Sequence, residues 1–359
     1  MKQFAALLLV MALLLGCCAC GAQSGNQTPA AETIQFTDGA GRNVELPAQI
    51  TRIAASGPNA QMILMTLCPE LLVGLASTPS DEQKPYFPES MWELPTFGQF
   101  YGSKANLNME ALIDAKPQLV IDLGDRKDSI AEDMDMVQEQ TGIPTIFLEA
   151  TLETLPAAYR TLGELLDRQE QAEKLAQYVE KTLSMAEENR AKIAEADSLR
   201  VMYGTGPTGL ACNARGSVQA DVIELIGAQN AIVSEEVSNR GGGTTVNLEE
   251  VYAVDPDVIL LTADGPYDTL SDGEWAELTA VQNSRYYEIP ELPYNWMSSP
   301  PSVNRVLGVW WLGNLLYPEL YDYDMVQTAQ EFYSLFWHYE LSQAEAEQML
   351  ARSTLRPAP

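Results

Sequence analysis

The chain has 359 residues, 46% of them hydrophobic, and a formal charge of −29 at neutral pH. This length favours two domains over one, and the apolar content suffices for two cores. The acidity excludes a nucleic-acid binder, because phosphate contacts need a basic patch. It favours solubility and says little about a small ligand.

The first 16 residues have the pattern of a signal peptide. Lys2 supplies a positive charge, and an unbroken apolar run follows from Phe4 to Leu15. A bilayer core needs about 20 apolar residues, so this run is too short to remain as a membrane anchor. We expect residues 1–16 to be removed on export and the mature protein to be extracytoplasmic.

Small residues and cysteines follow the apolar run. The segment Leu14-Leu15-Gly16-Cys17 resembles the lipobox of bacterial lipoproteins, in which cleavage precedes a cysteine that carries diacylglycerol. The resemblance implies a lipid anchor to the membrane on Cys17, with Cys20 as the alternative. An ordinary secreted protein with incidental cysteines is the competing interpretation. The polar composition of residues 17–33 predicts a flexible tether.

Residues 34–168 predict an N-terminal lobe. Alternating polarity around Asp38-Gly39-Ala40-Gly41 indicates a β-hairpin. Beyond it, short apolar strands alternate with segments of helical spacing, which is typical of parallel sheets with covered faces. The predicted strands are 51–55, 71–75, 118–123 and 144–148, and the predicted helices are 60–67 and 109–115.

A long helix is predicted next. Residues 169–196 contain no Gly or Pro and place apolar residues at helical spacing. The alternation of strands and helices then restarts in residues 197–359, the predicted C-terminal lobe. The predicted fold class is therefore α/β, with two lobes on mostly parallel sheets joined by one long helix.

An internal repeat supports the division into two lobes. Residues 108–121 match residues 247–260 position for position. In each copy a proline stands seven positions after a glutamate, at Glu110 and Pro117 in the first and at Glu249 and Pro256 in the second. Because proline ends a helix, each copy predicts a helix of about two turns followed by a buried strand. Chance similarity of two common helix–strand units is the alternative.

Signatures of catalysis and cofactor binding are weak. The glycines of residues 204–209 match a dinucleotide-binding loop, but six more residues precede the next helical run, so a flexible loop fits better. His338 is the single histidine, which excludes a multi-histidine zinc site and argues against a Ser-His-Asp hydrolase. Cys68 and Cys212 are expected to be buried free thiols. We expect no enzyme activity, no resident cofactor and no metal site, although the 50 acidic residues leave a catalytic carboxylate pair open.

Several motifs in fixed order carry a family resemblance. They are the hairpin turn ending at Pro47, Arg52-Ile-Ala-Ala-Ser56 with Leu72-Val-Gly-Leu75, the two Glu-to-Pro units, and Pro300-Pro-Ser-Val-Asn-Arg305-Val-Leu-Gly308 with residues 311–318. In this order they resemble the helical-backbone class of ABC-importer solute-binding proteins, which take up ferric siderophores, haem and cobalamin. The resemblance covers nearly the whole mature chain. It implies an ABC permease and its ATPase as partners of a monomeric protein.

The resemblance also implies which residues dock onto the permease. In that family an acidic residue on each lobe docks into arginine pockets of the permease, and the match places these residues at Glu110 and Glu249. Two charges on separate rigid lobes would set the orientation of docking. Either could instead complement a helix dipole, and Glu250 competes with Glu249 for the second role.

The ligand is expected between the lobes, where loops at the carboxyl ends of strands face one another. Aromatic side chains would cover the flat face of a chelate, and arginines would hold carboxylate or oxyanion groups. Arg305 is expected to be structural. The candidate ligand-binding residues are Ser56, Asn59, Tyr101, Arg126, Tyr203, Arg215, Arg240, Trp296 and Met297.

The identity of the ligand stays open at this point. No histidine lies near the expected cleft, so haem ligation would need Met297 or a tyrosine. We rank a ferric siderophore first, a corrinoid second and haem third, and a metal oxyanion or another metal chelate remains an alternative. An extracytoplasmic carboxylate-based enzyme on the same fold and a purely structural lipoprotein are the hypotheses from other classes.

Overall fold

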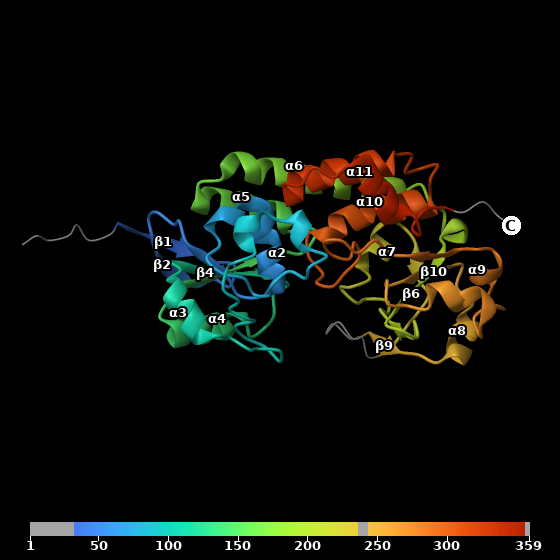
Figure 1. Ribbon diagram of the computed structural model, residues 1–359, viewed down its shortest axis with the longest axis horizontal. Helices are drawn as coiled ribbons and strands as arrows, with labels where there is room; N and C mark the ends of the chain where they lie inside the picture. Colours follow the sequence, from blue (N-terminus) through green and yellow to red (C-terminus); the bar gives the residue numbers. More distant parts are fainter. Residues whose placement is uncertain (1–31, 236–242, 356–359) are drawn as a thin grey trace, which may run out of the picture.

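The computed structural model of the protein describes residues 32–235 and 243–355. The predicted signal peptide, the candidate lipidation sites Cys17 and Cys20 and most of the predicted tether lie outside these residues, and so does Arg240. The described chain forms two α/β lobes side by side, with a layer of helices along one side of both (Figure 1). This arrangement confirms the predicted fold class.

The N-terminal lobe contains a parallel sheet and a separate hairpin. Its strands are β1 (Thr33–Thr37), β2 (Asn43–Pro47), β3 (Ile53–Ala55), β4 (Leu119–Gly124) and β5 (Thr145–Glu149). β1 and β2 pair in antiparallel, and the parallel sheet has the order β3-β4-β5. The predicted strand at 71–75 forms only isolated bridges, through Leu72 and Leu75. The helices are α2 (Pro58–Leu67), α3 (Met109–Ala115), α4 (Ile130–Thr141) and α5 (Leu155–Leu166), with 3-10 turns at Pro69–Leu71, Lys84–Tyr86 and Glu89–Met91.

One ion pair fixes the hairpin to this sheet. Asp38 is buried, and its carboxylate accepts from the backbone N–H of Arg42 at 2.9 Å and from the Arg42 guanidinium at 3.1 Å. The same guanidinium donates to the carbonyl of Thr145 in β5 at 2.9 Å. The Asp-Gly-Ala-Gly-Arg sequence therefore serves both the turn and its attachment to the lobe.

The C-terminal lobe is built on one sheet. Its strands are β6 (Arg200–Thr205), β7 (Ala211–Cys212), β8 (Gln229–Asn230), β9 (Thr244–Thr245), β10 (Val258–Leu261) and β11 (Tyr286–Glu288). β8, β6, β10 and β11 are parallel neighbours, and β7 and β9 extend the sheet in antiparallel. The helices are α7 (Asp221–Leu225), α8 (Leu248–Val254), α9 (Thr279–Gln282) and α10 (Asn304–Leu316), with 3-10 turns at Glu195–Asp197 and Tyr267–Asp272.

The linking helix is α6 (Gln169–Arg190), which ends at Arg190 rather than at the predicted residue 196. The turn tightens there, because the N–H of Ile193 bonds to the carbonyl only three residues back. The Asn189 side chain donates to the carbonyl of Leu320 at 3.0 Å and anchors this end to the C-terminal lobe. No glycine or proline marks the end, so the sequence pattern could not show it.

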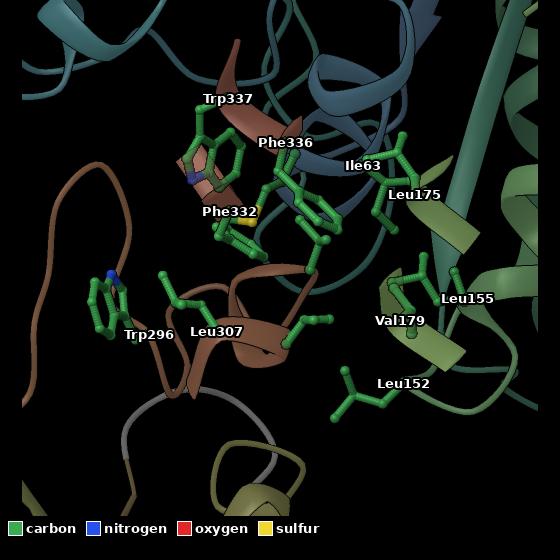
Figure 2. Close-up of a cluster of buried hydrophobic side chains, with 14 of the residues drawn as sticks. Ile63, Leu152, Leu155, Leu175, Val179, Trp296, Leu307, Phe332, Phe336 and Trp337 are labelled. Atoms are coloured by element: carbon green, nitrogen blue, oxygen red, sulfur yellow. The ribbon is translucent and has the colours of Figure 1, made fainter. Parts of the chain in front are cut away.

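One hydrophobic core runs from the first lobe through the helical layer into the second (Figure 2). It includes Ile63 of α2, Val179 of α6 and Leu307 of α10, all nearly inaccessible to solvent. The rings of Phe332 and Phe336 stack with centroids 4.2 Å apart within it. The lobes are therefore joined by packed side chains as well as by the linking helix.

The C-terminal segment bridges the two lobes. It comprises α11 (Met325–Phe332), a π-helix (Tyr333–Trp337) and α12 (Gln343–Leu350). Trp337 packs edge-on against Phe87 of the N-terminal lobe, and the imidazole Nε2 of His338 lies 3.1 Å from the carbonyl oxygen of Thr66 at the end of α2. The predicted C-terminal lobe, 197–359, thus includes a segment that packs on both lobes.

The two copies of the internal repeat fold alike. α3 and α8 each follow an asparagine, Asn108 or Asn247, whose side chain accepts from the backbone N–H three residues later. Each helix ends at a residue in left-handed conformation, Lys116 or Asp255, before the proline and the buried strand. Shared caps at both ends make chance similarity a poor explanation.

An arginine outside the repeat holds the end of each of these helices. Arg52, just before β3, and Arg200, at the start of β6, each donate to two successive carbonyls at the helix C-terminus. The accepting carbonyls are those of Ala115 and Lys116 in the first copy and Val254 and Asp255 in the second. Both lobes therefore use the same device to set a helix against its sheet.

We expect Arg52→Ala and Arg200→Ala each to lower the free energy of unfolding by about 1 kcal/mol, because terminal carbonyls lose a cationic donor. Lysine should restore only part of the loss, since it lacks the guanidinium fork. Urea unfolding followed by circular dichroism measures the effect. Lys174→Ala is the control, because its exposed ion pair with Glu170 contributes little; an equal loss in the control would contradict the prediction.

Candidate ligand-binding site

Segments of the two lobes come together in what we call the inter-lobe site. On the N-terminal side it comprises Ser56 to Asn59 after β3, Tyr101, and Asp122 to Lys127 at the end of β4. On the C-terminal side it comprises residues 295–302 and the start of α7. The Ser302 hydroxyl lies 3.4 Å from the carbonyl oxygen of Asn59, which brings the two sides into contact.

A buried carboxylate organises the N-terminal side. Asp122 is 6% exposed and accepts from the Ser56 hydroxyl at one oxygen and from the Tyr101 hydroxyl, at 2.7 Å, at the other. Burial raises the pKa of Asp122, and the two hydroxyl donors and Lys127 oppose that rise. The structure thus brings together Ser56 and Tyr101, two of the predicted residues, through a third that the sequence analysis did not select.

Tyr101 is half-buried and held as a neutral phenol. Burial and the neighbouring Asp122 carboxylate raise its pKa far above the ordinary value. The Lys127 ammonium lies 5.3 Å from the centroid of its ring. The fixed hydroxyl orients the ring, so Tyr101 offers an aromatic surface beside a cation.

On the C-terminal side, hydrogen bonds with buried side chains fix the backbone of residues 295–298. The Asn295 side-chain oxygen accepts from the N–H groups of Met297 and Ser298, each at 3.0 Å, and the Tyr203 hydroxyl lies 2.7 Å from the Ser298 hydroxyl. Gly308 of α10 lies directly behind: a Cβ there would stand 2.1 Å from the Trp296 carbonyl oxygen. This close approach explains the glycine of the Arg305-Val-Leu-Gly308 motif.

Three predicted ligand residues support this wall instead of facing a ligand. Tyr203, Trp296 and Met297 are 0%, 2% and 0% exposed. The Trp296 indole N–H donates to the Tyr333 hydroxyl at 3.3 Å and its ring packs edge-on against Trp311. The side chains of Tyr203, Trp296 and Met297 are part of the core shared by the lobes. We therefore no longer expect them to contact a ligand directly.

The predicted arginines have separate positions. Arg126 is exposed and donates to the hairpin carbonyl of Gly39 at 3.0 Å, and Arg215 is exposed and donates to the carbonyl of Asn230 at 3.1 Å. Their guanidinium groups keep free donors for a ligand. Arg305 is 2% exposed and pairs with Asp221, in agreement with the structural role expected for it.

Asp221, at the start of α7, faces the first lobe. Burial raises the pKa of Asp221 to about 6, and the carboxylates of Asp125 and Glu153 add to the rise while Arg305 opposes it. One of its oxygens is buried and makes no hydrogen bond within the described chain. Like charges from both lobes therefore converge here.

A cavity of about 580 Å³ adjoins the inter-lobe site and shares Asn295 and Ser299 with it. Its walls come from the N-terminal loop containing Gln83, from Ala263 after β10, from the end of β11 and the segment after it, and from α12. None of the predicted ligand residues lines it. Gln83 donates to the carbonyl of Pro293 at 2.7 Å, so the lobes touch along this cavity.

The two candidate docking residues occupy equivalent positions. Glu110 and Glu249 are both exposed, and each is the second residue of its helix, α3 or α8. The Glu250 carboxylate accepts from the N–H of Asn247 at 2.8 Å in a capping box, which leaves Glu249 as the free acid. Figure 1 shows α3 and α8 at opposite ends of the molecule, on the side away from α6.

A family model described as "Periplasmic binding protein" matches residues 54–292. The chain belongs to this family. The match runs from β3 to the segment after β11, so the family assignment rests on both lobes. The expected resemblance to solute-binding proteins of the helical-backbone class is confirmed.

Individual relatives agree with this assignment. The binding protein is 23% identical to YhfQ of Bacillus subtilis, named as an ABC transporter substrate-binding lipoprotein, over 86% of this chain and 96% of the relative. It is 25% identical to the vitamin B12-binding protein of Pectobacterium atrosepticum, over 43% of this chain and 54% of that protein. A solved ABC transporter solute-binding protein from Sulfurospirillum deleyianum is 28% identical, covers 88% of this chain and 99% of its own, and has a TM-score of 0.80.

None of the helices within 32–235 and 243–355 is long and apolar enough to cross a membrane. The same residues contain no group of three or more His, Cys, Asp or Glu side chains placed to hold a metal ion.

We expect the Asp221 carboxyl to titrate near pH 6 in the folded binding protein, against an ordinary value of 3.8. Because the folded state binds this proton more tightly than the unfolded chain, the group's contribution to stability is present below its ordinary pKa and is lost as the pH rises through about 6. Carboxyl ¹³C NMR measures the titration, with Asp221→Asn to assign the signal.

Glu153→Gln should lower the Asp221 pKa, because it removes a like charge from the opposite lobe. A midpoint below about 4.5 in the unsubstituted protein would show that burial does not act as described.

Proposed function

We propose that the binding protein is a lipid-anchored extracytoplasmic receptor of an ABC importer, which captures a ferric siderophore or related metal chelate between its lobes and delivers it to the permease. The observation that carries the proposal is the pair of matched docking helices. Glu110 and Glu249 project from equivalently capped helices of two lobes that a shared core holds together. A permease with two basic pockets could read both charges at once.

The inter-lobe site supplies chemistry suited to such a chelate. Tyr101 offers a flat aromatic surface, Lys127 a cation beside it, and Arg126 guanidinium donors. We propose Arg215 of the C-terminal lobe as a further donor, since within the described residues its guanidinium has only the Asn230 carbonyl as a hydrogen-bond partner. Catecholate, hydroxamate and carboxylate groups around a metal are acceptors for these donors. Neutral phenol and hydroxyl groups around Asp122 add directed hydrogen-bonding capacity.

A corrinoid is the second candidate, and the similarity to a vitamin B12-binding protein favours it. Haem is less well supported. His338 lies at the junction with α2, the Tyr101 hydroxyl donates to Asp122, and Met297 is fully buried. Each of these axial-ligand candidates is thus engaged or inaccessible.

Titration of the purified protein with a ferric catecholate, a ferric hydroxamate, cobalamin, cobinamide and haem tests the ligand class. We expect saturable one-to-one quenching of tryptophan fluorescence by at least one ferric siderophore. Tyr101→Ala should weaken that binding by about ten-fold, because the aromatic contact is lost. Tyr101→Phe should cost less, since the ring remains.

Trp92→Phe, at an exposed tryptophan of the N-terminal lobe, is the control for loss of signal without loss of binding. No saturable response to any ligand would refute the receptor, and recovery of a chemically altered ligand after prolonged incubation would favour the enzyme.

Docking is tested with the permease and ATPase in proteoliposomes. Glu110→Ala and Glu249→Ala should leave ligand affinity unchanged and lower ligand-dependent ATPase stimulation by at least five-fold each, because each removes one docking charge. Glu132→Ala, an exposed glutamate in the first turn of α4, is the matched control. Full stimulation by the double variant would refute the docking roles.

A further inference from the structure

The cavity beside the inter-lobe site has the properties of a second binding site. Its volume of about 580 Å³ lies within the range of small-molecule pockets. Four separate parts of the chain form it: the loop with Glu82, Ala263 after β10, the segment with Glu291, and α12. None of the lining residues is a lysine or an arginine.

The cavity carries uncompensated negative charge. Of its four carboxylates, Glu288 pairs with Arg352 at 3.0 Å, and Glu345 accepts from the N–H of Ser342 at 2.8 Å in the cap of α12. Glu82 and Glu291 form no ion pair within the described residues. Burial raises the pKa of Glu291, and the nearby Asp264 and Glu288 carboxylates add to the rise, while hydrogen bonds from the Asn295 side chain and the Ala263 backbone oppose it. A cation bound here would reverse that penalty.

Tyr86 gives an independent indication of a ligand. Its side chain lines the cavity, and the residue is only 8% exposed. Its ring is fixed by Tyr333 and Tyr339, with centroids 5.8 and 4.9 Å away. Its hydroxyl makes no hydrogen bond to any other described residue and is not among the fully buried unpaired atoms, so it is open to a partner in the cavity. A second ring, that of Tyr294, also lines the cavity.

We propose that this cavity binds an organic cation, whose ammonium group compensates Glu82 and Glu291 and donates to the Tyr86 hydroxyl oxygen. The tyrosine rings supply apolar and cation–π contact for the carbon skeleton. A bare divalent ion fits less well, because hard cations take several carboxylate or carbonyl oxygens and Tyr86 is a neutral phenol here. The proposal does not depend on the identity of the chelate in the inter-lobe site.

Cadaverine, an alkyl diamine, is the probe, and isothermal titration calorimetry of the full mature chain is the measurement. We expect saturable one-to-one binding, and no binding of 1,5-pentanediol, which has the same length without charge. Glu291→Gln and Glu82→Gln should each weaken binding by about five- to ten-fold through loss of a charged partner. Tyr86→Phe should weaken it by about three-fold and leave the thermal midpoint unchanged or higher, because the hydroxyl has no partner to lose.

Glu331→Gln is the matched control, because it removes one carboxylate from α11 outside the cavity. Equal weakening by this control would show general attraction to an acidic protein and overturn the site. Binding of Mn²⁺ in place of cadaverine, or no saturable binding of cadaverine, would also overturn it. Each failure leaves the ferric-siderophore titration unaffected, so the two proposals can fail separately.

Discussion

The shared core behind the two lobes is the constraint on which the rest of the structure depends. α6 alone would leave the lobes free to bend about one helix. Tyr178 of α6 instead contacts Phe336 of the π-helix, and the Trp310 indole of α10 donates to Thr182 of α6 at 2.8 Å. Close-packed protein cores transmit displacement rather than absorb it. The two walls of the inter-lobe site are therefore set largely before a ligand arrives, and adjustment is left to side chains such as Lys127.

The internal repeat gives the same rigidity to the outer ends of the molecule. In each lobe an asparagine starts the helix and a left-handed residue ends it. An arginine at or just before the start of a strand donates to its last carbonyls. Local caps and one long-range contact together fix where Glu110 and Glu249 stand. Because the shared core fixes the lobes as well, the separation of the two acids is a property of the whole fold.

Features that depend on local pattern were predictable from the sequence, and features that depend on which surfaces meet were not. Periodicity and the proline spacing predicted the lobes, the linking helix and the paired helices. Trp296 and Met297 were expected at the ligand because loops at the carboxyl ends of strands should face it, yet both side chains pack into the shared core. Nothing in a single sequence says that the C-terminal segment returns to cover α2. Asp122 did leave a signal, as the one charge inside an apolar strand.

The C-terminal segment that bridges the lobes also affects the order in which parts of the protein can fold. Residues 325–350 come last along the chain, yet their rings cover Tyr86 and Phe87 near its beginning. In a chain that crosses a membrane from its N-terminus, the first lobe emerges with that apolar face open to water. It stays open until almost the whole polypeptide has passed. During that time the first lobe must avoid aggregation through its exposed apolar face. A high negative charge opposes aggregation, because chains of like charge repel one another.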